Sequence, residues 1–127
     1  MIISCGTDIV EIKRMKTAIK KWKKSFLNHI FSQQEIKYSR SRRFQFQHLA
    51  ARFAAKEAVL KAFGDGFTSA DFKDIGITND ENGRPKVTLK GNLEKLRKKE
   101  KIDNIVVSMS HTHNYAQAVA ILVRNKK

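Results

Sequence analysis

The sequence predicts an α+β fold in which a largely antiparallel sheet packs on a long helix. Apolar runs of strand length stand near both ends of the chain, and an alanine-rich helical segment fills the middle. Strands do not alternate regularly with helices, as they do in doubly wound parallel sheets. The expected order is one strand, three helices, two strands, one helix and two strands. At 127 residues, the chain suits a single domain spanning positions 1–127.

The first strand and the first two helices follow from local patterns. Ile2 to Ile9 is an apolar run, as expected of a buried strand. Over residues 11 to 22, one apolar stripe recurs with helical period against a lysine-rich back, and it consists of Ile12, Met15, Ile19 and Trp22. Ser32 and Glu35 have the spacing of a capping box, which predicts that a short second helix starts there.

The remaining elements begin with the long helix, which is predicted from Arg43 to Phe63 and ended by Gly64. Asp65 to Ser69 is expected to be a loop. The Asp, Asn, Gly and Pro content of Asp80 to Pro85 predicts a hairpin turn, and a short basic helix is expected from Gly91 to Lys99. The predicted strands of this half are Phe72 to Thr78, Lys86 to Leu89, Ile105 to Ser110 and Tyr115 to Val123.

Composition excludes several classes of protein. With 41% hydrophobic residues and one proline, the chain is neither disordered nor fibrous. No apolar stretch approaches the ~20 residues of a bilayer-spanning helix, and the amino terminus lacks the pattern of a signal peptide. The single cysteine, Cys5, cannot form an internal disulfide, which favours a cytoplasmic location. We expect its side chain to be buried in the first strand.

The chain is strongly basic, with a formal net charge of +14. Such a surface attracts nucleic acid, anionic membranes, phosphorylated ligands or acidic proteins. Basic residues cluster between Lys13 and Lys24 and again between Lys37 and Arg43. A nucleic-acid-binding protein is therefore the main alternative to an enzyme, and a membrane-surface role for residues 12 to 24 is a third possibility.

Three ionisable residues indicate chemistry at a phosphate group. Glu57 and Lys61 lie one helical turn apart, and Asp8 stands in the first apolar run. Two carboxylates and a lysine suit a hard cation bound next to a phosphate, although Glu57 and Lys61 alone could be an ordinary helix pair. A nucleic-acid binder would leave both carboxylates unexplained, because they repel phosphates unless a metal intervenes.

Several familiar signatures are missing from the sequence. It contains no GxGxxG motif and no GxxxxGK[ST] phosphate loop, so a phosphate site must use side-chain cations or loops of another kind. It also lacks a zinc-spaced set of cysteines and histidines and a nucleophile elbow. These absences argue against a zinc enzyme and a serine hydrolase.

Two motifs together resemble the signature of the 4′-phosphopantetheinyl transferases. The first is Gly6-Thr7-Asp8, and the second is RFAAKEAVLKAFG from Arg52 to Gly64. Chain length and the late segment Ser108 to Thr112 are similar to the short, single-domain branch of that family. The resemblance covers Ile3 to about Val123. Cys5 and Thr7 replace residues that are usually aliphatic in the family, which concerns packing rather than chemistry.

The resemblance implies a reaction and its catalytic residues. Members of this family transfer the 4′-phosphopantetheine group of coenzyme A to a serine of an acyl carrier protein and release adenosine 3′,5′-bisphosphate, in support of fatty acid biosynthesis. By the same resemblance, Asp8 and Glu57 bind Mg²⁺ and Lys61 meets the same phosphates. These three residues would be the catalytic ones.

The resemblance also implies contacts with coenzyme A. The positions that match phosphate contacts are Arg52, Lys61, His111 and Thr112. The turn Asn82-Gly83-Arg84-Pro85 matches the one that lies against the adenine, and Gly64 would let the backbone approach the ligand. Without the resemblance, His111 is more simply a structural histidine and Asn82-Gly83 an ordinary hairpin turn.

Protein partners are implied as well. The family docks the acidic acyl carrier protein on its basic first helix, where Arg14 matches a contact position and Lys20, Lys21 and Lys24 are further candidates. The short branch forms homotrimers with sites between subunits, so a homotrimer is expected here. Neither a nucleic acid nor a membrane is expected as a partner.

Overall fold

The structure is a computed structural model that describes residues 1–64 and 69–125, so the loop predicted at 65–69 lies almost wholly outside the described residues. The helices and strands follow the predicted order. They are β1 (Ile2–Glu11), α1 (Ile12–Ile30), α2 (Gln33–Arg40), α3 (Gln45–Phe63), β2 (Ile75–Asn79), β3 (Pro85–Leu89), α4 (Gly91–Lys99), β4 (Asn104–His111) and β5 (Tyr115–Val123), with a 3₁₀ helix, η1 (Ser69–Asp74), before β2.

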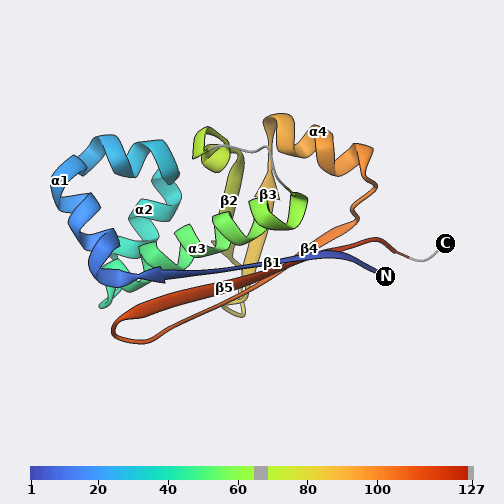
Figure 1. Cartoon of the computed structure of the whole chain (residues 1–127). Coiled ribbons are helices and arrows are strands. Elements are labelled where there is room, and N and C mark those ends of the chain that lie inside the picture. The colour runs from blue at the N-terminus through green and yellow to red at the C-terminus, as the bar shows by residue number, and fades with distance from the viewer. Residues whose placement is uncertain (65–68, 126–127) are drawn as a thin grey trace.

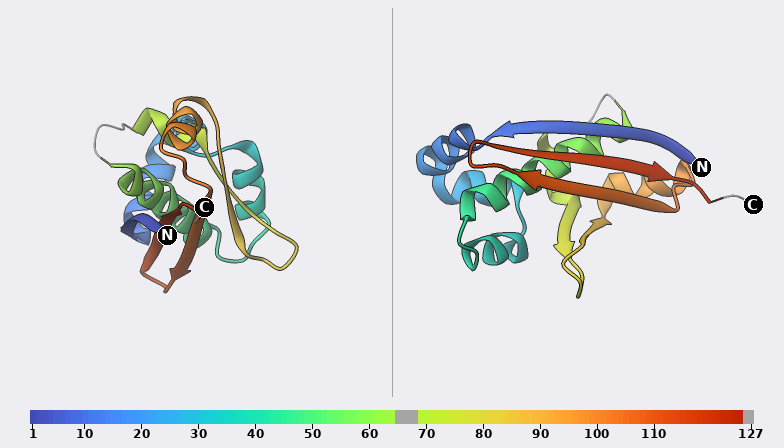
Figure 2. Two further views of the ribbon diagram at one scale, coloured as in Figure 1. Left: turned by 90° about the vertical axis from the view of Figure 1, so that its right-hand side faces the viewer. Right: turned by 90° about the horizontal axis from the view of Figure 1, so that it is seen from below.

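The strands form two antiparallel sheets, a larger one with the order β1-β5-β4 and the β2-β3 hairpin. Helix α3 lies across one face of the larger sheet, with α1 and α2 toward one end of the molecule and α4 toward the other (Figure 1). Figure 2 shows that none of the drawn helices covers the opposite face of this sheet. The predicted α+β class and the antiparallel sheet packed on a long helix are confirmed. Among the described helices, none is both long and apolar enough to cross a membrane.

Small residues let α3 and β1 lie against each other. Ala54 and Ala58 of α3 are fully buried. A Cβ atom added to Gly6 of β1 would lie 2.1 Å from the carbonyl oxygen of Ala58 and 2.7 Å from the backbone nitrogen of Ala62. Gly6 therefore allows the strand to touch the backbone of the helix, which a side chain at this position would prevent.

Two local predictions from turn chemistry are confirmed. The Ser32 side chain accepts a hydrogen bond from the backbone N–H of Glu35, and the Glu35 side chain accepts one from the backbone N–H of Ser32, so both halves of the capping box are present. In the β2–β3 turn, Asp80 Oδ1 accepts hydrogen bonds from the backbone N–H groups of Asn82 and Arg84. Gly83 has a φ of +79°, which glycine adopts readily.

Most element boundaries differ from the prediction by one or two residues, as at the start of α3 (Gln45 rather than Arg43), and the largest differences are at β2 and α1. Strand β2 begins at Ile75 rather than at Phe72, because the residues before it form η1. Helix α1 continues to Ile30 across a break at Lys23, whose φ of 50° and ψ of −131° are not helical. The break ends the predicted apolar stripe, so Trp22 is 56% exposed while Ile12 and Met15 are buried.

The prediction that Cys5 is buried is wrong, because its thiol is exposed. Successive residues of a strand point to opposite faces of a sheet. Gly6 faces α3, so Cys5 faces the side of the larger sheet that the helices leave open.

Candidate active site

Asp8 takes its position from β1. It is two residues beyond Gly6, so both residues face α3, and its register partner in β5 is Ala118. Strand β1 is an edge strand, which leaves one of its sides unpaired with any other strand of the sheet. The Asp8 side chain is 16% exposed and is held between the strand and the helix.

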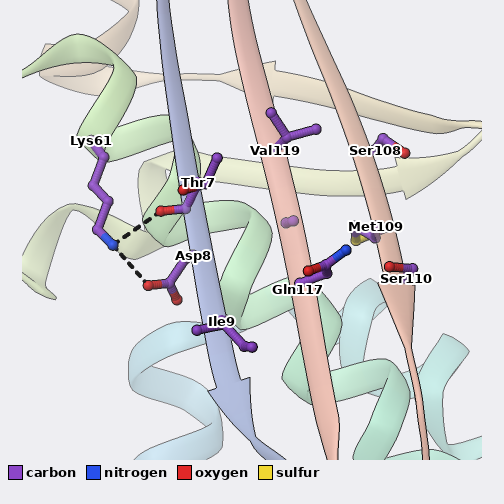
Figure 3. Close-up of a pocket in the computed structure, with 10 residues that line it drawn as sticks. Thr7, Asp8, Ile9, Lys61, Ser108, Met109, Ser110, Gln117 and Val119 are labelled. Atoms are coloured by element: carbon purple, nitrogen blue, oxygen red, sulfur yellow. Dashed lines mark hydrogen bonds and ion pairs between the residues drawn. The ribbon is translucent and has the colours of Figure 1, made fainter.

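Lys61 reaches this carboxylate from α3. Its Nζ donates hydrogen bonds to Asp8 Oδ1 at 2.9 Å and to the carbonyl oxygen of Thr7 at 3.0 Å (Figure 3). The Lys61 side chain remains 53% exposed. Exposed ion pairs of this kind contribute only ~0–1 kcal/mol, so Lys61 can change partner at little cost.

Glu57 lies one helical turn before Lys61. Burial raises the pKa of the Glu57 carboxyl, the negative charge of Asp8 raises it further, and Lys61 opposes both effects. The two carboxylates thus repel each other across the contact between β1 and α3. The structure therefore brings Asp8, Glu57 and Lys61 together from separate parts of the sequence.

The two carboxylates at this centre fit a magnesium ion better than zinc. Zinc sites use three or four protein ligands, and no group of three His, Cys, Asp or Glu residues in the described ranges could hold a metal. Magnesium binds one or two carboxylates and completes its octahedral shell with water and phosphate oxygens. Asp8 and Glu57 supply that donor set, provided that a phosphate ligand supplies the rest.

A second region of interest adjoins the β2–β3 hairpin. A depression of about 280 Å³ is lined by four of the residues predicted to contact coenzyme A, namely Arg52, Gly83, Pro85 and His111. A neighbouring depression of about 330 Å³ shares Tyr38, Arg52, Asn79 and Gly83 with it. Residues from α2, α3, β4 and the hairpin therefore converge around Arg52.

Arg52 is a buried cation, with only 2% of its surface exposed. Its guanidinium carbon lies 4.4 Å from the centre of the Tyr38 ring, and its Nη2 donates a hydrogen bond to Asn79 Oδ1. Burial lowers the pKa of Arg52, whereas Tyr38 and Glu35 raise it. Its Nε finds no hydrogen-bond partner among the described residues. A buried guanidinium with an unused donor is well suited to an anionic ligand.

Sequence reasoning missed His48 and Asn79 in this region. His48 lies between Tyr38 and His111, with ring centroids 5.9 Å and 5.6 Å away. Burial lowers the pKa of His48, and the charges of Arg52, His111 and Arg42 lower it further. Asn79 joins Arg52 to the hairpin. No short motif marks these residues, because each acts through a partner on a distant element.

The other predicted coenzyme A contacts are not among the residues that line these two depressions. Asn82 and Arg84 lie in the exposed turn of the hairpin. Thr112 Oγ1 accepts hydrogen bonds from the N–H groups of Asn114 and Tyr115, which shapes the turn between β4 and β5. Gly64 ends α3 with a φ of +108°, and apart from its chain neighbours no atom of the residues that the structure describes lies within 4 Å of the place where its Cβ would be.

The predicted docking residues on α1 are all exposed, and they are Arg14, Lys20, Lys21 and Lys24. Lys21 Nζ lies 5.1 Å from the centre of the exposed Trp22 ring. This helix therefore presents positive charge next to one large aromatic side chain.

The uncovered face of the larger sheet carries a depression of about 450 Å³ that reaches Asp8 and Lys61 (Figure 3). Outward residues of all three strands line it, including Thr7, Ile9, Ser108, Ser110, Gln117 and Val119. The face is partly apolar, with Ile9 65% and Val106 46% exposed.

Residues 4–120 match the family described as the 4′-phosphopantetheinyl transferase superfamily. A curated holo-[acyl-carrier-protein] synthase from Clostridium kluyveri is 45% identical over 126 residues, which cover 99% of this chain and 93% of that protein. A second from Halothermothrix orenii is 40% identical over 121 residues, or 95% of this chain and 97% of that protein.

Solved structures agree with these sequence comparisons. The crystal structure of holo-[acyl-carrier-protein] synthase from Neisseria meningitidis has a TM-score of 0.87 and 32% identity, and the match covers 98% of this chain and all of that one (100%). The Helicobacter pylori enzyme, solved in complex with coenzyme A, has a TM-score of 0.81 and 30% identity over 94% of this chain and 99% of that one.

Proposed function

The chain belongs to the 4′-phosphopantetheinyl transferase superfamily, and we propose that Asp8, Glu57 and Lys61 form the centre at which it transfers the 4′-phosphopantetheine group of coenzyme A to a serine of apo acyl carrier protein. This transfer is the reaction of the holo-[acyl-carrier-protein] synthases that the chain matches over nearly its whole length, and a role in fatty acid biosynthesis is consistent with the family. The proposed centre rests on one observation, the contact of Lys61 with Asp8 beside Glu57.

The transfer exchanges one bond at phosphorus for another. The serine Oγ forms a bond to the phosphorus that carries the phosphopantetheine arm, and the bond from that phosphorus to the bridging pyrophosphate oxygen breaks. Adenosine 3′,5′-bisphosphate leaves with the electron pair, and the serine proton is released. A site for this reaction must neutralise a pyrophosphate and hold the hydroxyl in line with the leaving oxygen.

Each residue of the proposed centre suits one of these tasks. Lys61 is exposed and weakly held by Asp8, so its ammonium can bind a phosphate oxygen instead. Asp8 and Glu57 are the residues that would hold Mg²⁺. When bound there, Mg²⁺ supplies positive charge that offsets the pyrophosphate and the leaving group. Mutual repulsion of the two carboxylates favours a cation between them.

For the nucleotide end of coenzyme A we propose the depressions around Arg52. Arg52 contributes a cation to this space, which His111, Gly83 and Pro85 also line. Asn82, Arg84 and Thr112 lie on the adjoining turns and are proposed as outer contacts. Gly64 and Lys61 are proposed on the side of the pyrophosphate. The guanidinium groups of Arg42 and Arg52 both lie near the Tyr38 ring, and a purine is proposed to stack against the same ring.

The acyl carrier protein is proposed to dock on α1, because an acidic partner would be attracted to Arg14, Lys20, Lys21 and Lys24. The nucleic-acid alternative explains the same charge but gives no use to Asp8 and Glu57. We further propose a cytoplasmic location, since the one cysteine of the chain is a free and exposed thiol.

We propose that the enzyme is a homotrimer assembled through the open face of the larger sheet. Exposed apolar residues on this face, such as Ile9 and Val106, favour burial against another surface. The same face reaches Asp8 and Lys61, so a second chain seated there would lie next to the proposed centre. Light scattering of the purified protein should give three times the mass of one chain, and a monomer at micromolar concentration would refute the trimer.

The proposed function is tested by incubating the protein with coenzyme A, Mg²⁺ and an apo acyl carrier protein, and weighing the carrier by mass spectrometry. We expect the carrier to gain one phosphopantetheine, and a chelator to abolish the gain. Transfer that persists in full with the chelator would exclude the metal. Absence of transfer to several carriers would exclude the function, and binding of nucleic acid would then be measured.

A further inference from the structure

A buried ion pair joins α2 to α3 outside the residues proposed above. Lys56 Nζ lies 2.7 Å from Glu35 Oε1, and the two side chains are 0% and 1% exposed. Lys56 also donates to the carbonyl oxygens of Ile30 at 2.7 Å and Phe72 at 3.4 Å. Each of the three ammonium protons therefore has an acceptor, as a buried charge requires.

The second oxygen of Glu35 binds the β2–β3 hairpin. Glu35 Oε2 accepts a hydrogen bond of 2.7 Å from the backbone N–H of Ile77 in β2, while Oε1 also accepts one from the N–H of Ser32. Among the described strands, the larger sheet does not extend to β2, and β3 is the one partner of β2. The carboxylate therefore takes the place of a neighbouring strand and fixes β2 relative to α2 and α3.

Strand β2, which Glu35 contacts at Ile77, also reaches the depressions around Arg52. Asn79 is two residues beyond Ile77 in the same strand. Its Oδ1 accepts the bond from Arg52 Nη2, and its Nδ2 donates to the carbonyl oxygen of Gly83 at 2.9 Å. Arg52 is in turn one helical turn before Lys56 on α3. The pair and the pocket thus share the same helix and the same strand, and Glu35 itself lines the neighbouring depression.

Stability alone is a weak explanation for the pair. Taking two charges out of water carries a desolvation cost that their attraction must first offset, and apolar residues of similar volume often stabilise a core equally well. Apolar residues could not, however, accept the hydrogen bond of Ile77. The pair is the arrangement that offers the hairpin a buried acceptor while keeping that acceptor neutralised.

We infer that Glu35 and Lys56 are positioning residues, which hold the β2–β3 hairpin against α3 so that Arg52, Asn79 and Gly83 form one binding pocket. The structure shows the contacts themselves, whereas the identity of the ligand, the nucleotide end of coenzyme A, rests on the proposed function. Neither residue reaches the reacting atoms. Their loss should therefore weaken coenzyme A binding and leave the interaction with the acyl carrier protein unchanged.

Two double variants separate positioning from stability. Glu35→Leu with Lys56→Met removes both charges and also the acceptor for Ile77. Glu35→Gln with Lys56→Met removes both charges but keeps an amide oxygen that can accept from Ile77. Coenzyme A affinity by calorimetry, Michaelis constants for both substrates and thermal unfolding would be measured for each. If the leucine variant does not fold, Glu35→Met replaces it, because its flexible side chain fits irregular sites more readily.

We expect the acceptor-free variant to bind coenzyme A about tenfold more weakly (~1.4 kcal/mol), since the N–H of Ile77 would lose its buried acceptor. The glutamine variant should stay within about threefold of the natural protein in coenzyme A affinity, although its melting temperature should resemble that of the leucine variant, because both variants lose the Lys56 ammonium. Natural affinity in the acceptor-free variant would overturn the inference. So would equal losses in both variants that follow their loss of stability.

A matched control removes an ion pair elsewhere. Glu94→Gln with Arg97→Met breaks the pair on α4, whose side-chain hydrogen bonds among the described residues join Glu94 and Arg97 to each other and Arg97 to the carbonyl oxygen of Ile102. Coenzyme A affinity should not change. Failure of the proposed function is recognised separately, because the natural protein itself would then bind no coenzyme A.

Discussion

Glu57 carries a carboxyl group whose ionisation is opposed by the protein around it. Its pKa is raised first by burial and then by Asp8. A carboxyl pKa that is higher in the folded state means that the unfolded chain binds fewer protons than the folded one over the interval between the two values. Stability therefore falls as pH rises through that interval, and above it the Glu57 charge destabilises the free protein in full.

Replacing Glu57 by Gln should separate stability from activity. Without metal or coenzyme A at neutral pH, we expect the melting temperature to rise by roughly 1–3 °C, because the repulsion between carboxylates is removed. Transfer should fall by a factor on the order of 10² to 10³, the cost of losing one group that stabilises charge in a transition state. Differential scanning fluorimetry and the mass assay measure the two effects.

The control for this change is Glu94→Gln on α4. A hydrogen bond from Arg97 lowers the pKa of Glu94, so its charge is favoured in the folded state and its removal should not raise the melting temperature. A destabilised Glu57→Gln variant that retains full transfer would contradict the role assigned to Glu57.

At the residue scale, the sequence predicted the proposed centre better than it predicted its surroundings. Asp8, Glu57 and Lys61 lie in two short motifs, and the fold brings those motifs together. The pair Glu35–Lys56 and the bond from Arg52 to Asn79 were not predicted, because no motif in the sequence links the two partners of either contact. Cys5 was placed wrongly because an apolar run does not reveal which face of a sheet is left uncovered.

At the scale of elements, the contact between β1 and α3 depends on Gly6. The carbonyl of Ala58 occupies the space that a side chain at Gly6 would need. Any larger residue must push the strand away from the helix, and Asp8 would then move away from Glu57 and Lys61.

Gly6→Ala should therefore reduce both stability and transfer. We expect a loss of about 1–3 kcal/mol in the free energy of unfolding, as for other overpacked cores, and a fall in transfer beyond what unfolding explains. Gly76→Ala is the control, because its Cβ would meet only the Oγ1 of Thr88, a side-chain atom that can rotate away. Chemical denaturation and the mass assay report the outcome. Equal effects of the two substitutions would refute the close-contact argument.

Elements with local signals were predicted well, and those without them were not. The capping box of α2 and the Asp-Asn-Gly turn of the hairpin encode their own geometry. No glycine or proline in the sequence marks the break in α1 at Lys23. Phe72 was assigned to a strand because it is apolar, yet its buried side chain belongs to a 3₁₀ helix.

At the scale of the whole molecule, the net charge of +14 attracts any polyanion, so only its distribution can distinguish partners. Charge reversal at two sites tests this distribution. Arg14→Glu with Lys24→Glu on α1 and Lys98→Glu with Lys99→Glu on α4 change exposed residues and lower the net charge equally, from +14 to +10.

The α1 variant should raise the Michaelis constant for acyl carrier protein by about tenfold at low salt, while the α4 variant should change it little. The difference should shrink as ionic strength rises, because salt screens exposed charges beyond ~8–10 Å. Steady-state transfer assays at several salt concentrations measure it. Equal effects of the two variants on this Michaelis constant would mean that the interaction with acyl carrier protein depends only on the net charge of the protein.

The contact of Gly6 with α3 also has a consequence for chain length. Two residues of an antiparallel strand advance ~6.8 Å, and four residues of an α-helix advance ~6 Å, so the two scales nearly coincide. Gly6 lies against Ala58 and Ala62, whereas Val10, further along the strand, packs with the group that contains Ala50 and Ala51, which come earlier on the helix. The strand and the helix therefore run in opposite directions, and two strand residues span about the same length as four helix residues. A single residue inserted between Gly6 and Asp8 would turn the carboxylate to the far side of the sheet. The number of residues between the glycine and the aspartate is therefore as much a part of the motif as their identity, and β1 should accept many substitutions at Thr7 but no insertion beside it.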